Sequence, residues 1–210
     1  MIKIEKMVVQ NIGRAVYSAR NAMNSWDRSD SHGDVLGEND LKLAKTLAKA
    51  GTSDRKYLRM VTVLVDITAP LYWWKEFDTY KIGTVANSCS TMHKIHAKEF
   101  TLDDFSHEHL LFLARENLEN TIRTLNRYRN EYNDVTRGAK NKDYWWQIIQ
   151  LLPSSFNQKR TVMMNYEVLA NMYHSRKNHK LDEWRELCKW VKSLPYSVLI
   201  TGEEQWNGEY

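Results

Sequence analysis

Apolar residues recur at every second position in two parts of the chain, and each part predicts a β-strand. The N-terminal run MIKIEKMVVQNI alternates apolar and polar residues. In RMVTVLVDIT the apolar positions are Val61, Val63, Val65 and Ile67, which predicts a strand with one strongly apolar face. Pro70 ends this strand, because proline has no N–H to donate to a neighbouring strand.

Helical spacing predominates in the rest of the chain. The stretch DRSDSHGDVLGEND is polar and contains glycine, which indicates a surface loop. Asn39 or Asp40 is expected to cap the helix after this loop, and Gly51 to end it. Helices are predicted over 14–26, 41–50, 71–80, 107–132, 143–152, 165–177 and 181–194.

The helix predicted over 107–132 is the longest. Thr101 and Asp104 before it resemble a capping box, and its charged residues are expected to form a solvated face. Its apolar stripe consists of Leu111, Leu118, Ile122, Leu125 and Tyr132. No internal repeat or linker interrupts the pattern, so we expect an α+β fold in which helices predominate, with one domain over residues 1–210.

Composition narrows the range of partners. The net charge of +4 and the pI near 8.9 fit an anionic partner such as a nucleotide, or equally a solvated basic surface. They are too small to indicate nucleic-acid binding. No apolar run is long enough to span a membrane or to form a signal peptide, and Cys89 and Cys188 are too few for a disulfide framework. A cytoplasmic protein without a membrane partner is therefore expected.

The stretch YKIGTVANSCSTMHK, residues 80–94, is rich in small and hydroxyl-bearing residues. Such residues let a backbone approach a ligand closely and offer it short donors. One reading is a loop that binds a phosphate through Ser88, Ser90 and backbone N–H groups, with charge from Lys81 or Lys94. The other reading is an ordinary connection between two elements.

Other chemistry is weakly supported. His93 and His96 lack the spacing of a metal site, as do Asp103 and His107, so no metal is expected. No GxSxG, Walker or GxGxxG motif is present. Cys89 is either a nucleophile or, as is commoner for a single cysteine, a small buried residue.

Arg176 lies near the end of a predicted amphipathic helix, where a cation complements the helix C-terminus. Alternatively, its planar guanidinium faces a pocket and donates to a carbonyl, a phosphate or an ionised base. Asn165 and Asn171 precede it within or at the edge of the same helix, and neither amide has an obvious capping role.

The order of these features resembles the flavin-dependent thymidylate synthases, the ThyX family. That family has a motif RHRxxSxNxxSxR after a strand, an Ala-Pro and a short helix with Arg-Gln-Trp. Here Ala69-Pro70 follows the strand VTVLVDIT, Lys75-Glu76-Phe77 stands for Arg-Gln-Trp, and Asn87 and Ser90 match the core of the motif. QLLP at 150–153 matches a Leu-Pro segment, and Asn165, Asn171 and Arg176 recur at the family spacing, followed by Trp184. The similarity covers nearly the whole chain.

Several charged residues of the family pattern are replaced. RHR becomes Thr79-Tyr80-Lys81 if one residue is inserted, and the arginine that closes the motif becomes Met92. Ile149 stands for the arginine before Leu-Pro, and Glu167 for the arginine two residues after the first asparagine. The turn GTSDRKYLRM lacks the family's histidines. Each charge-assisted hydrogen bond lost in this way removes about 1.5–3 kcal/mol.

The resemblance implies a ThyX-like, helix-rich α+β domain with a small, mainly antiparallel sheet, assembled as a homotetramer with active sites between subunits. It implies methylation of dUMP to dTMP, with FAD as hydride carrier, methylenetetrahydrofolate as donor and NADPH as a further co-substrate. It makes Arg176 the catalytic residue. The substrate-binding residues it implies are Glu76, Thr79, Ser88, Cys89, Ser90, Thr91, Met92 and Arg176. The flavin-binding residues are Thr79, Tyr80, Lys81, Asn87, Ser88, Asn165 and Asn171.

Two functions stay open on the sequence. The first is a divergent flavin-dependent thymidylate synthase-like enzyme, favoured by Ser90 and Arg176. The second is a nucleotide-binding protein of the same fold that has lost flavin chemistry, favoured by Thr79-Tyr80-Lys81 in place of RHR.

Overall fold

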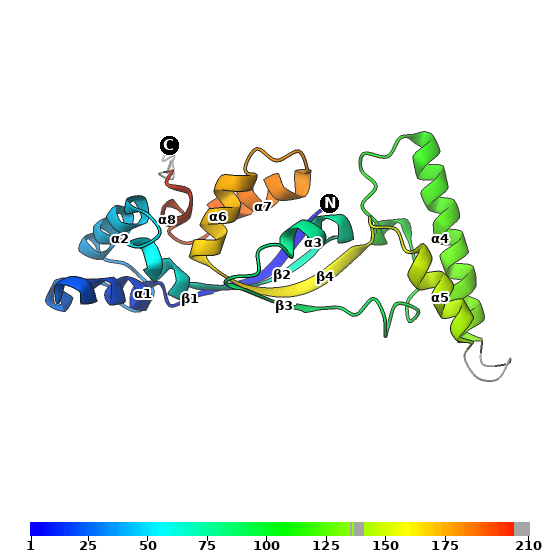
Figure 1. Cartoon of the computed structure of the whole chain (residues 1–210), viewed down its shortest axis with the longest axis horizontal. Helices are drawn as coiled ribbons and strands as arrows, with labels where there is room; N and C mark the ends of the chain where they lie inside the picture. The colour runs from blue at the N-terminus through cyan, green and yellow to red at the C-terminus, as the bar shows by residue number, and fades with distance from the viewer. Residues whose placement is uncertain (135, 137–140, 204–210) are drawn as a thin grey trace. The chain divides into compact units, whose positions relative to one another are not determined.

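A computed structural model describes residues 1–134, 136 and 141–203 of the chain (Figure 1). The fold is α+β and helix-rich, with an antiparallel four-stranded sheet in the order β1-β2-β4-β3. The strands are β1 Lys3–Gln10, β2 Thr62–Pro70, β3 Thr84–Ser88 and β4 Asn157–Asn165. The α-helices are α1 Ile12–Ala19, α2 Glu38–Ala50, α3 Leu71–Phe77, α4 Phe112–Asn133, α5 Lys142–Leu151, α6 Tyr166–Arg176, α7 Asp182–Lys192 and α8 Val198–Thr201. The 3-10 helices are η1 Arg20–Met23, η2 Trp26–Arg28, η3 Arg55–Met60 and η4 Leu102–Asp104.

The chain forms two compact units, and each is described by itself. The first unit contains Met1, Thr68–Asp78 and Ser88–Arg160. The second contains Ile2–Ile67, Thr79–Asn87 and the chain from Thr161 onward. Strands β2, β3 and β4 contribute residues to both units.

The core of the second unit includes the predicted apolar face of β2. Val61, Val63, Val65 and Ile67 are fully buried, which confirms the period-two pattern. The long helix 14–26 is wrong, because α1 ends at Ala19 and the chain continues as 3-10 helix. The cap predicted for α2 is also wrong, since both candidates lie inside the helix.

The N-terminus of α2 is capped from the preceding loop. Asp30 accepts the N–H groups of Asn39 and Asp40 at 2.8 and 3.0 Å. Asp40 is itself buried and pairs with Arg20 at 2.6 Å. Burial raises the pKa of Asp40, but the hydrogen bonds from Ser31, Ser29 and Arg20 outweigh it and lower the pKa below its ordinary value.

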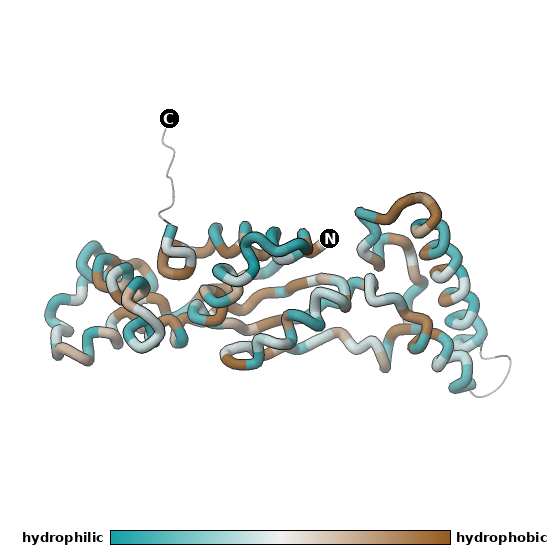
Figure 2. Tube along the Cα trace, turned by 45° about the horizontal axis from the view of Figure 1, so that its top comes forward, coloured by the Kyte–Doolittle hydropathy of each residue, from teal (hydrophilic) through white to brown (hydrophobic). Residues whose placement is uncertain are grey.

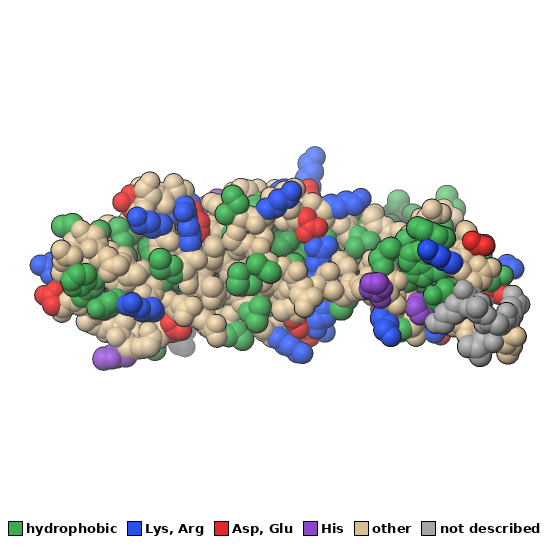
Figure 3. All heavy atoms as spheres, turned by 60° about the horizontal axis from the view of Figure 1, so that its bottom comes forward, with side chains coloured by type: hydrophobic (Ala, Val, Ile, Leu, Met, Phe, Trp, Pro, Cys, Tyr) green, Lys and Arg blue, Asp and Glu red, His purple; other side chains and the backbone are tan. Residues whose placement is uncertain are grey.

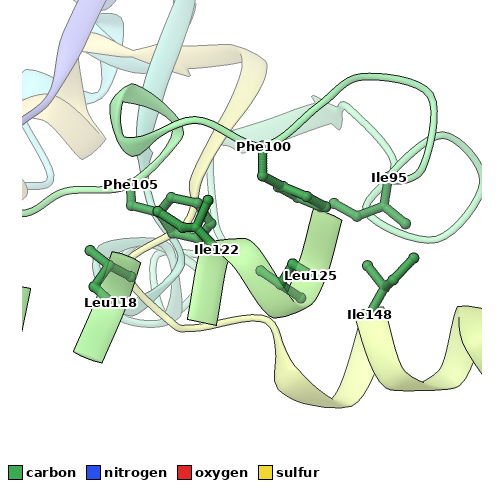
Figure 4. Close-up of a cluster of buried hydrophobic side chains, with 7 residues drawn as sticks. All are labelled: Ile95, Phe100, Phe105, Leu118, Ile122, Leu125 and Ile148. Atoms are coloured by element: carbon green, nitrogen blue, oxygen red, sulfur yellow. The ribbon is translucent and has the colours of Figure 1, made fainter. Parts of the chain in front are cut away.

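The first unit has a core of its own, in which apolar side chains point toward one another (Figure 4). Helices α4 and α5 pack together at this core. The η4 turn next to it has the predicted capping box between Thr101 and Asp104. The buried members of the core are Ile95, Phe100, Phe105, Leu118, Ile122, Leu125 and Ile148.

The start of α4 differs from the prediction. The helix begins at Phe112 rather than at His107, and the preceding Leu111 is extended. Ser106, which could have capped an earlier start, instead donates to Asn157 and accepts from the terminal amine of Met1. Leu111 is therefore 83% exposed and does not belong to the buried stripe. Figure 2 shows the apolar run at the start of α4 in brown.

Strands β3 and β4 were not expected from the sequence. The stretch 84–88 consists of small and polar residues, and it is a strand only because it pairs with β4. In β4, Gln158, Val162 and Met164 are buried, whereas Lys159, Arg160 and Thr161 between them hide the alternation. Residues 84–88 are therefore a strand, and neither the loop nor the ordinary connection expected over 80–94 describes this part.

Candidate functional site

The guanidinium of Arg176 lies at the C-terminal end of α6 against two aromatic rings of the second unit. Its Nε donates a hydrogen bond of 2.9 Å to the phenol oxygen of Tyr80. Its Cζ lies 4.9 Å from the ring centroid of Trp184 and 5.7 Å from that of Tyr80. Trp184 is fully buried, while Tyr80 and Arg176 are half-buried. A phenol and a buried indole therefore orient a guanidinium that is partly accessible to solvent.

The segment after Tyr80 is fixed to the start of the same helix. Gly83 has φ +82°, a conformation that residues with a Cβ rarely adopt. A Cβ at this position would lie 2.6 Å from Nδ2 of Asn165. Residues 80–83 thus lie close to both ends of α6: Gly83 packs near Asn165 at its beginning, and Tyr80 accepts a hydrogen bond from Arg176 at its end.

The two predicted asparagines of this helix have different surroundings. Oδ1 of Asn165 accepts the N–H of Val168 at 2.9 Å, so Asn165 caps α6, and the expectation that it has no capping role is wrong. Its position directly before a helical apolar pattern was the signal for this cap. Asn171 is exposed, and its Oδ1 accepts from Nη2 of Arg55 at 3.5 Å.

Arg55 and Glu167 form an ion pair at the first turn of α6. The Nε and Oε2 atoms are 3.0 Å apart, and Nη2 donates to Oε1 at 3.1 Å. The side chains are only 18% and 9% exposed. No local pattern predicts this pair, because its members are 112 positions apart. Glu167 also stands where the ThyX pattern has arginine, so this position carries a negative charge that Arg55 balances.

The other residues predicted in the second unit are exposed. Thr79 and Lys81 flank Tyr80, and Asn87 lies near the end of β3, an edge strand. The carbonyl oxygen of Tyr80 accepts from the hydroxyl of Thr84, which closes the turn between them. Lys81 is the one cation between Thr79 and Asn87.

In the first unit, the turn after β3 borders a cavity of about 560 Å³. Cys89, Ser90 and Thr91 from the prediction line it together, and so do Lys94 and Lys159. Apolar rings of the unit's core form another part of its wall, those of Phe100 and Phe156. Lys98, Glu99 and Asp104 also line it, and Lys98 pairs with Asp104 at 3.0 Å. The cavity therefore combines short donors, three lysines and two carboxylates with an apolar surface, and its net positive charge suits a small anion that carries a flat ring.

Ser90 organises this turn with its own hydroxyl. The Oγ accepts the N–H groups of Met92 and His93 at 3.1 and 3.0 Å. With its oxygen engaged as an acceptor, the hydroxyl proton is the part suited to an anion. Both contacts are local, because their partners lie two and three positions along the chain.

Two neighbours from β4 were missed by the sequence reasoning. Nε2 of buried Gln158 donates to the carbonyl of Cys89 at 2.8 Å, and the N–H of Cys89 donates to the carbonyl of Lys159 at 2.9 Å. These two hydrogen bonds attach the turn to β4, so that Cys89 lines the cavity next to Gln158 and Lys159. The available signal was the period-two spacing of Val162 and Met164, but the polar residues Lys159, Arg160 and Thr161 before them concealed it.

Met92 and Glu76 lie elsewhere in the first unit. Met92 lines a separate cavity of about 380 Å³ with His93, His96 and Trp145. Nε1 of Trp145 donates to the carbonyl of Met92 at 3.1 Å. Glu76 is half-buried on α3. Ser88, the last residue of β3, is exposed.

The two cysteines contrast in their environments. Cys89 is exposed beside the cavity, so its reading as a small buried residue is wrong. Cys188 is buried in α7, and burial raises the pKa of its thiol to about 11, with nearby Lys192 and Lys177 acting in the opposite direction. Cys188 is therefore protonated at neutral pH.

Among the described residues, no group of histidines, cysteines and carboxylates could hold a metal ion. Within the same part of the chain, no helix is long and apolar enough to cross a bilayer. On the face drawn in Figure 3, lysines and arginines are scattered among acidic side chains. An anion at this face would thus be recognised by a few local groups rather than by a broad basic patch.

Comparison with known proteins gives a match in structure. The structure of flavin-dependent thymidylate synthase ThyX from Helicobacter pylori, complexed with FAD and dUMP, superposes with a TM-score of 0.67. The chain has the ThyX fold. The aligned region covers 96% of this chain and 98% of that one, at 16% identity. A second structure of the H. pylori ThyX with FAD and dUMP gives a TM-score of 0.66 at 16% identity, covering 96% and 97% of the two chains.

A related methylase has the same architecture. The UMP/dUMP methylase PolB from Streptomyces cacaoi, bound with 5-Br dUMP, matches with a TM-score of 0.59 at 11% identity. The match covers 96% of this chain and 94% of that one. No protein-family model and no curated protein matches the sequence. The likeness to ThyX thus concerns the fold, which is the part of the predicted resemblance that is confirmed.

Proposed function

We propose that this chain binds a pyrimidine mononucleotide and methylates dUMP to dTMP, as a divergent flavin-dependent thymidylate synthase-like enzyme. The observation that carries the proposal is the orientation of Arg176 by Tyr80 and Trp184 in a chain with the ThyX fold. In this proposal methylenetetrahydrofolate donates the one-carbon unit, and NADPH is the reductant. The coverage of 96% of the chain by ThyX supports treating both units as one ThyX-like domain over residues 1–210.

Arg176 is assigned to the pyrimidine ring. A guanidinium has only donors, and it suits the carbonyl oxygens of uracil. C5 of uracil attacks the one-carbon unit as a nucleophile, and it is a stronger nucleophile when the ring carries negative charge, which its carbonyl oxygens share. A guanidinium already oriented before the reaction stabilises this charge without reorganisation, and this lowers the barrier.

The nucleotide phosphate is assigned to the cavity of the first unit. The Ser90 hydroxyl donates a hydrogen bond to a phosphate oxygen. Backbone N–H groups of the turn add further donors, and Lys94 adds positive charge. Cys89, Thr91 and Met92 belong to the same turn, with Glu76, Thr79 and Ser88 as further substrate contacts. We propose a homotetramer with active sites between subunits, so Arg176 and Ser90 at one site need not come from the same chain.

The residues of the second unit fit a flavin ring better than they fit its diphosphate. Lys81, Asn87 and Asn171 are exposed and offer one cation and two amides. Asn165 keeps its Nδ2 as a donor, while its oxygen is used in the α6 cap. Thr79 and Tyr80 border the same segment. These residues would hold FAD, which, once reduced by NADPH, would supply the hydride for the new methyl group.

A second function is favoured by one observation, the Arg55–Glu167 pair. Arg55 donates a hydrogen bond to the Asn171 side chain, and its positive charge is balanced by the carboxylate of Glu167. A diphosphate at this position would meet a neutralised pair instead of a cation. This supports the alternative, a nucleotide-binding protein of the ThyX fold that has lost flavin chemistry.

The two functions are separated by two measurements on the purified full chain. Flavin absorbance of the protein, before and after addition of FAD, tests the cofactor. Calorimetric titration with dUMP tests the nucleotide. The enzyme predicts that both bind and that dTMP forms when methylenetetrahydrofolate and NADPH are added. Binding of dUMP by a protein that stays colourless with added FAD supports the alternative. Binding of neither ligand contradicts both.

A further inference from the structure

We infer that Tyr80 is a positioning residue, which orients Arg176 so that this protein selects uracil over cytosine nucleotides. The inference rests on the proposed role of Arg176 and deepens it. Tyr80 occupies a position that the ThyX pattern gives to a residue of its RHR triplet. Its role here follows from its contact with the guanidinium rather than from that pattern.

The contacts define the direction of a planar group. One hydrogen bond in the plane, from Nε to the phenol oxygen at 2.9 Å, sets the rotation of the guanidinium. The indole of Trp184, with its centroid 4.9 Å from Cζ, sets the tilt of its plane. Together they determine where the two terminal nitrogens point. A lysine in place of Arg176 could not be oriented in this way, because an ammonium has no plane.

Tyr80 is itself held firmly enough to serve as a reference. Its ring meets that of Trp184 edge to face at 5.8 Å, and Trp184 is fully buried. Its backbone is fixed on the other side by the bond from Thr84 and by Gly83, which Asn165 packs against. The phenol oxygen therefore has little freedom to follow Arg176, and Arg176 has to follow it.

The consequence is discrimination between bases. At position 4, uracil presents a carbonyl oxygen and cytosine an amino group, which is a donor. A fixed guanidinium satisfies the oxygen and faces the amino group donor to donor, which leaves both groups unpaired and disfavours cytosine. A guanidinium free to rotate would avoid that conflict. Loss of the Tyr80 hydroxyl should therefore reduce selectivity as well as affinity.

The test compares Tyr80→Phe with the unchanged protein, using calorimetric titration with dUMP, dCMP and 2-deoxyribose 5-phosphate. Tyr196→Phe is the matched control, because its phenol oxygen accepts one hydrogen bond of 2.8 Å from Leu36 within the same unit. We expect Tyr80→Phe to weaken dUMP binding about fivefold to tenfold and to lower the dUMP-to-dCMP preference by a similar factor. Binding of the base-free sugar phosphate, and all three affinities of Tyr196→Phe, should stay unchanged.

A second measurement detects the contact without any nucleotide. The Arg176 Nε–H signal in a nitrogen-15 NMR spectrum, assigned by its loss in Arg176→Lys, should be protected from solvent exchange in the unchanged protein and exposed in Tyr80→Phe. Equal protection in both proteins would overturn the inference, and so would equal weakening of all three ligands. If the unchanged protein binds dUMP no better than the sugar phosphate, the proposed role of Arg176 fails, and the inference fails with it. If the unchanged protein prefers dUMP to the sugar phosphate but Tyr80→Phe keeps the same dUMP-to-dCMP preference, only the inference about Tyr80 is overturned.

Discussion

The two candidate regions differ in how far along the chain their contacts reach. Arg176 is held by Tyr80, which is 96 positions away. The hydroxyl of Ser90 is held by Met92 and His93, two and three positions away. The first arrangement exists only when the second unit is folded, whereas the second needs little more than a turn.

This difference indicates that the two regions suit different parts of a ligand. A group held by distant elements has one orientation, and it suits the part of a ligand that must be distinguished from close analogues. A local turn of small residues adapts more easily, and it suits a phosphate, which presents several equivalent oxygens. Changes near α6 should therefore affect turnover, selectivity or stability, and changes in the turn should affect affinity alone.

The largest effect is expected from Arg176→Ala. Removing a donor that stabilises developing charge should lower dTMP formation about 100-fold to 1,000-fold. The thermal midpoint should change little, because the side chain is half-buried at a helix end. Arg185→Ala, on the adjacent α7, is the control and should keep its turnover. Turnover close to that of the unchanged protein would remove Arg176 from the site.

Next comes Arg55→Ala, which leaves the mostly buried carboxylate of Glu167 without its partner. The free energy of unfolding should fall by about 3 kcal/mol, measured by denaturant titration. Arg59→Ala changes an exposed arginine of the same η3 turn and should have little effect. Adding Glu167→Gln to Arg55→Ala should restore part of the loss, because it removes the buried charge. No recovery would mean that the pair stabilises α6 by packing rather than by charge.

A smaller loss of stability is expected from Gly83→Ala. The methyl group meets Nδ2 of Asn165, which cannot swing away without breaking the cap of α6. Strain at positive φ and the weakened cap together should cost about 2–3 kcal/mol. Gly202→Ala is the control, because Gly202 also has a positive φ but nothing within 4 Å of an added Cβ. If the two variants lose equal stability, Asn165 does not constrain the 80–83 segment.

The smallest effect is expected from Ser90→Ala. Affinity for dUMP and for 2-deoxyribose 5-phosphate should fall together, about threefold to tenfold, because the lost hydroxyl faces the phosphate. Unfolding should be unaffected, since both bonds of the hydroxyl are local and exposed. Ser193→Ala removes a hydroxyl that bonds only to the nearby carbonyl of Trp190 and serves as the control. A loss for dUMP without a loss for the sugar phosphate would assign Ser90 to the base instead.

Local patterns were sufficient for much of the fold. The alternation in β2, the capping box at Thr101 and Asp104, and the helices before Pro153 and after Asn165 are all where the sequence predicts them. The predictions fail where the local structure depends on a residue distant in the sequence. Asp30 caps α2, pairing with β4 makes β3 a strand, and the bonds of Ser106 are accompanied by a later start of α4.

The candidate site divides in the same way. The sequence by itself determined the bonds of Ser90 to Met92 and His93, the end of α6 at Arg176 and the presence of short donors between 79 and 91, because these depend on neighbours a few positions away. Only the tertiary structure decided three contacts. Tyr80 accepts a hydrogen bond from Nε of Arg176, Glu167 forms an ion pair with Arg55, and Gln158 donates a hydrogen bond to the carbonyl of Cys89. Each of these contacts joins residues more than sixty positions apart, and no periodicity along the chain encodes such a pairing.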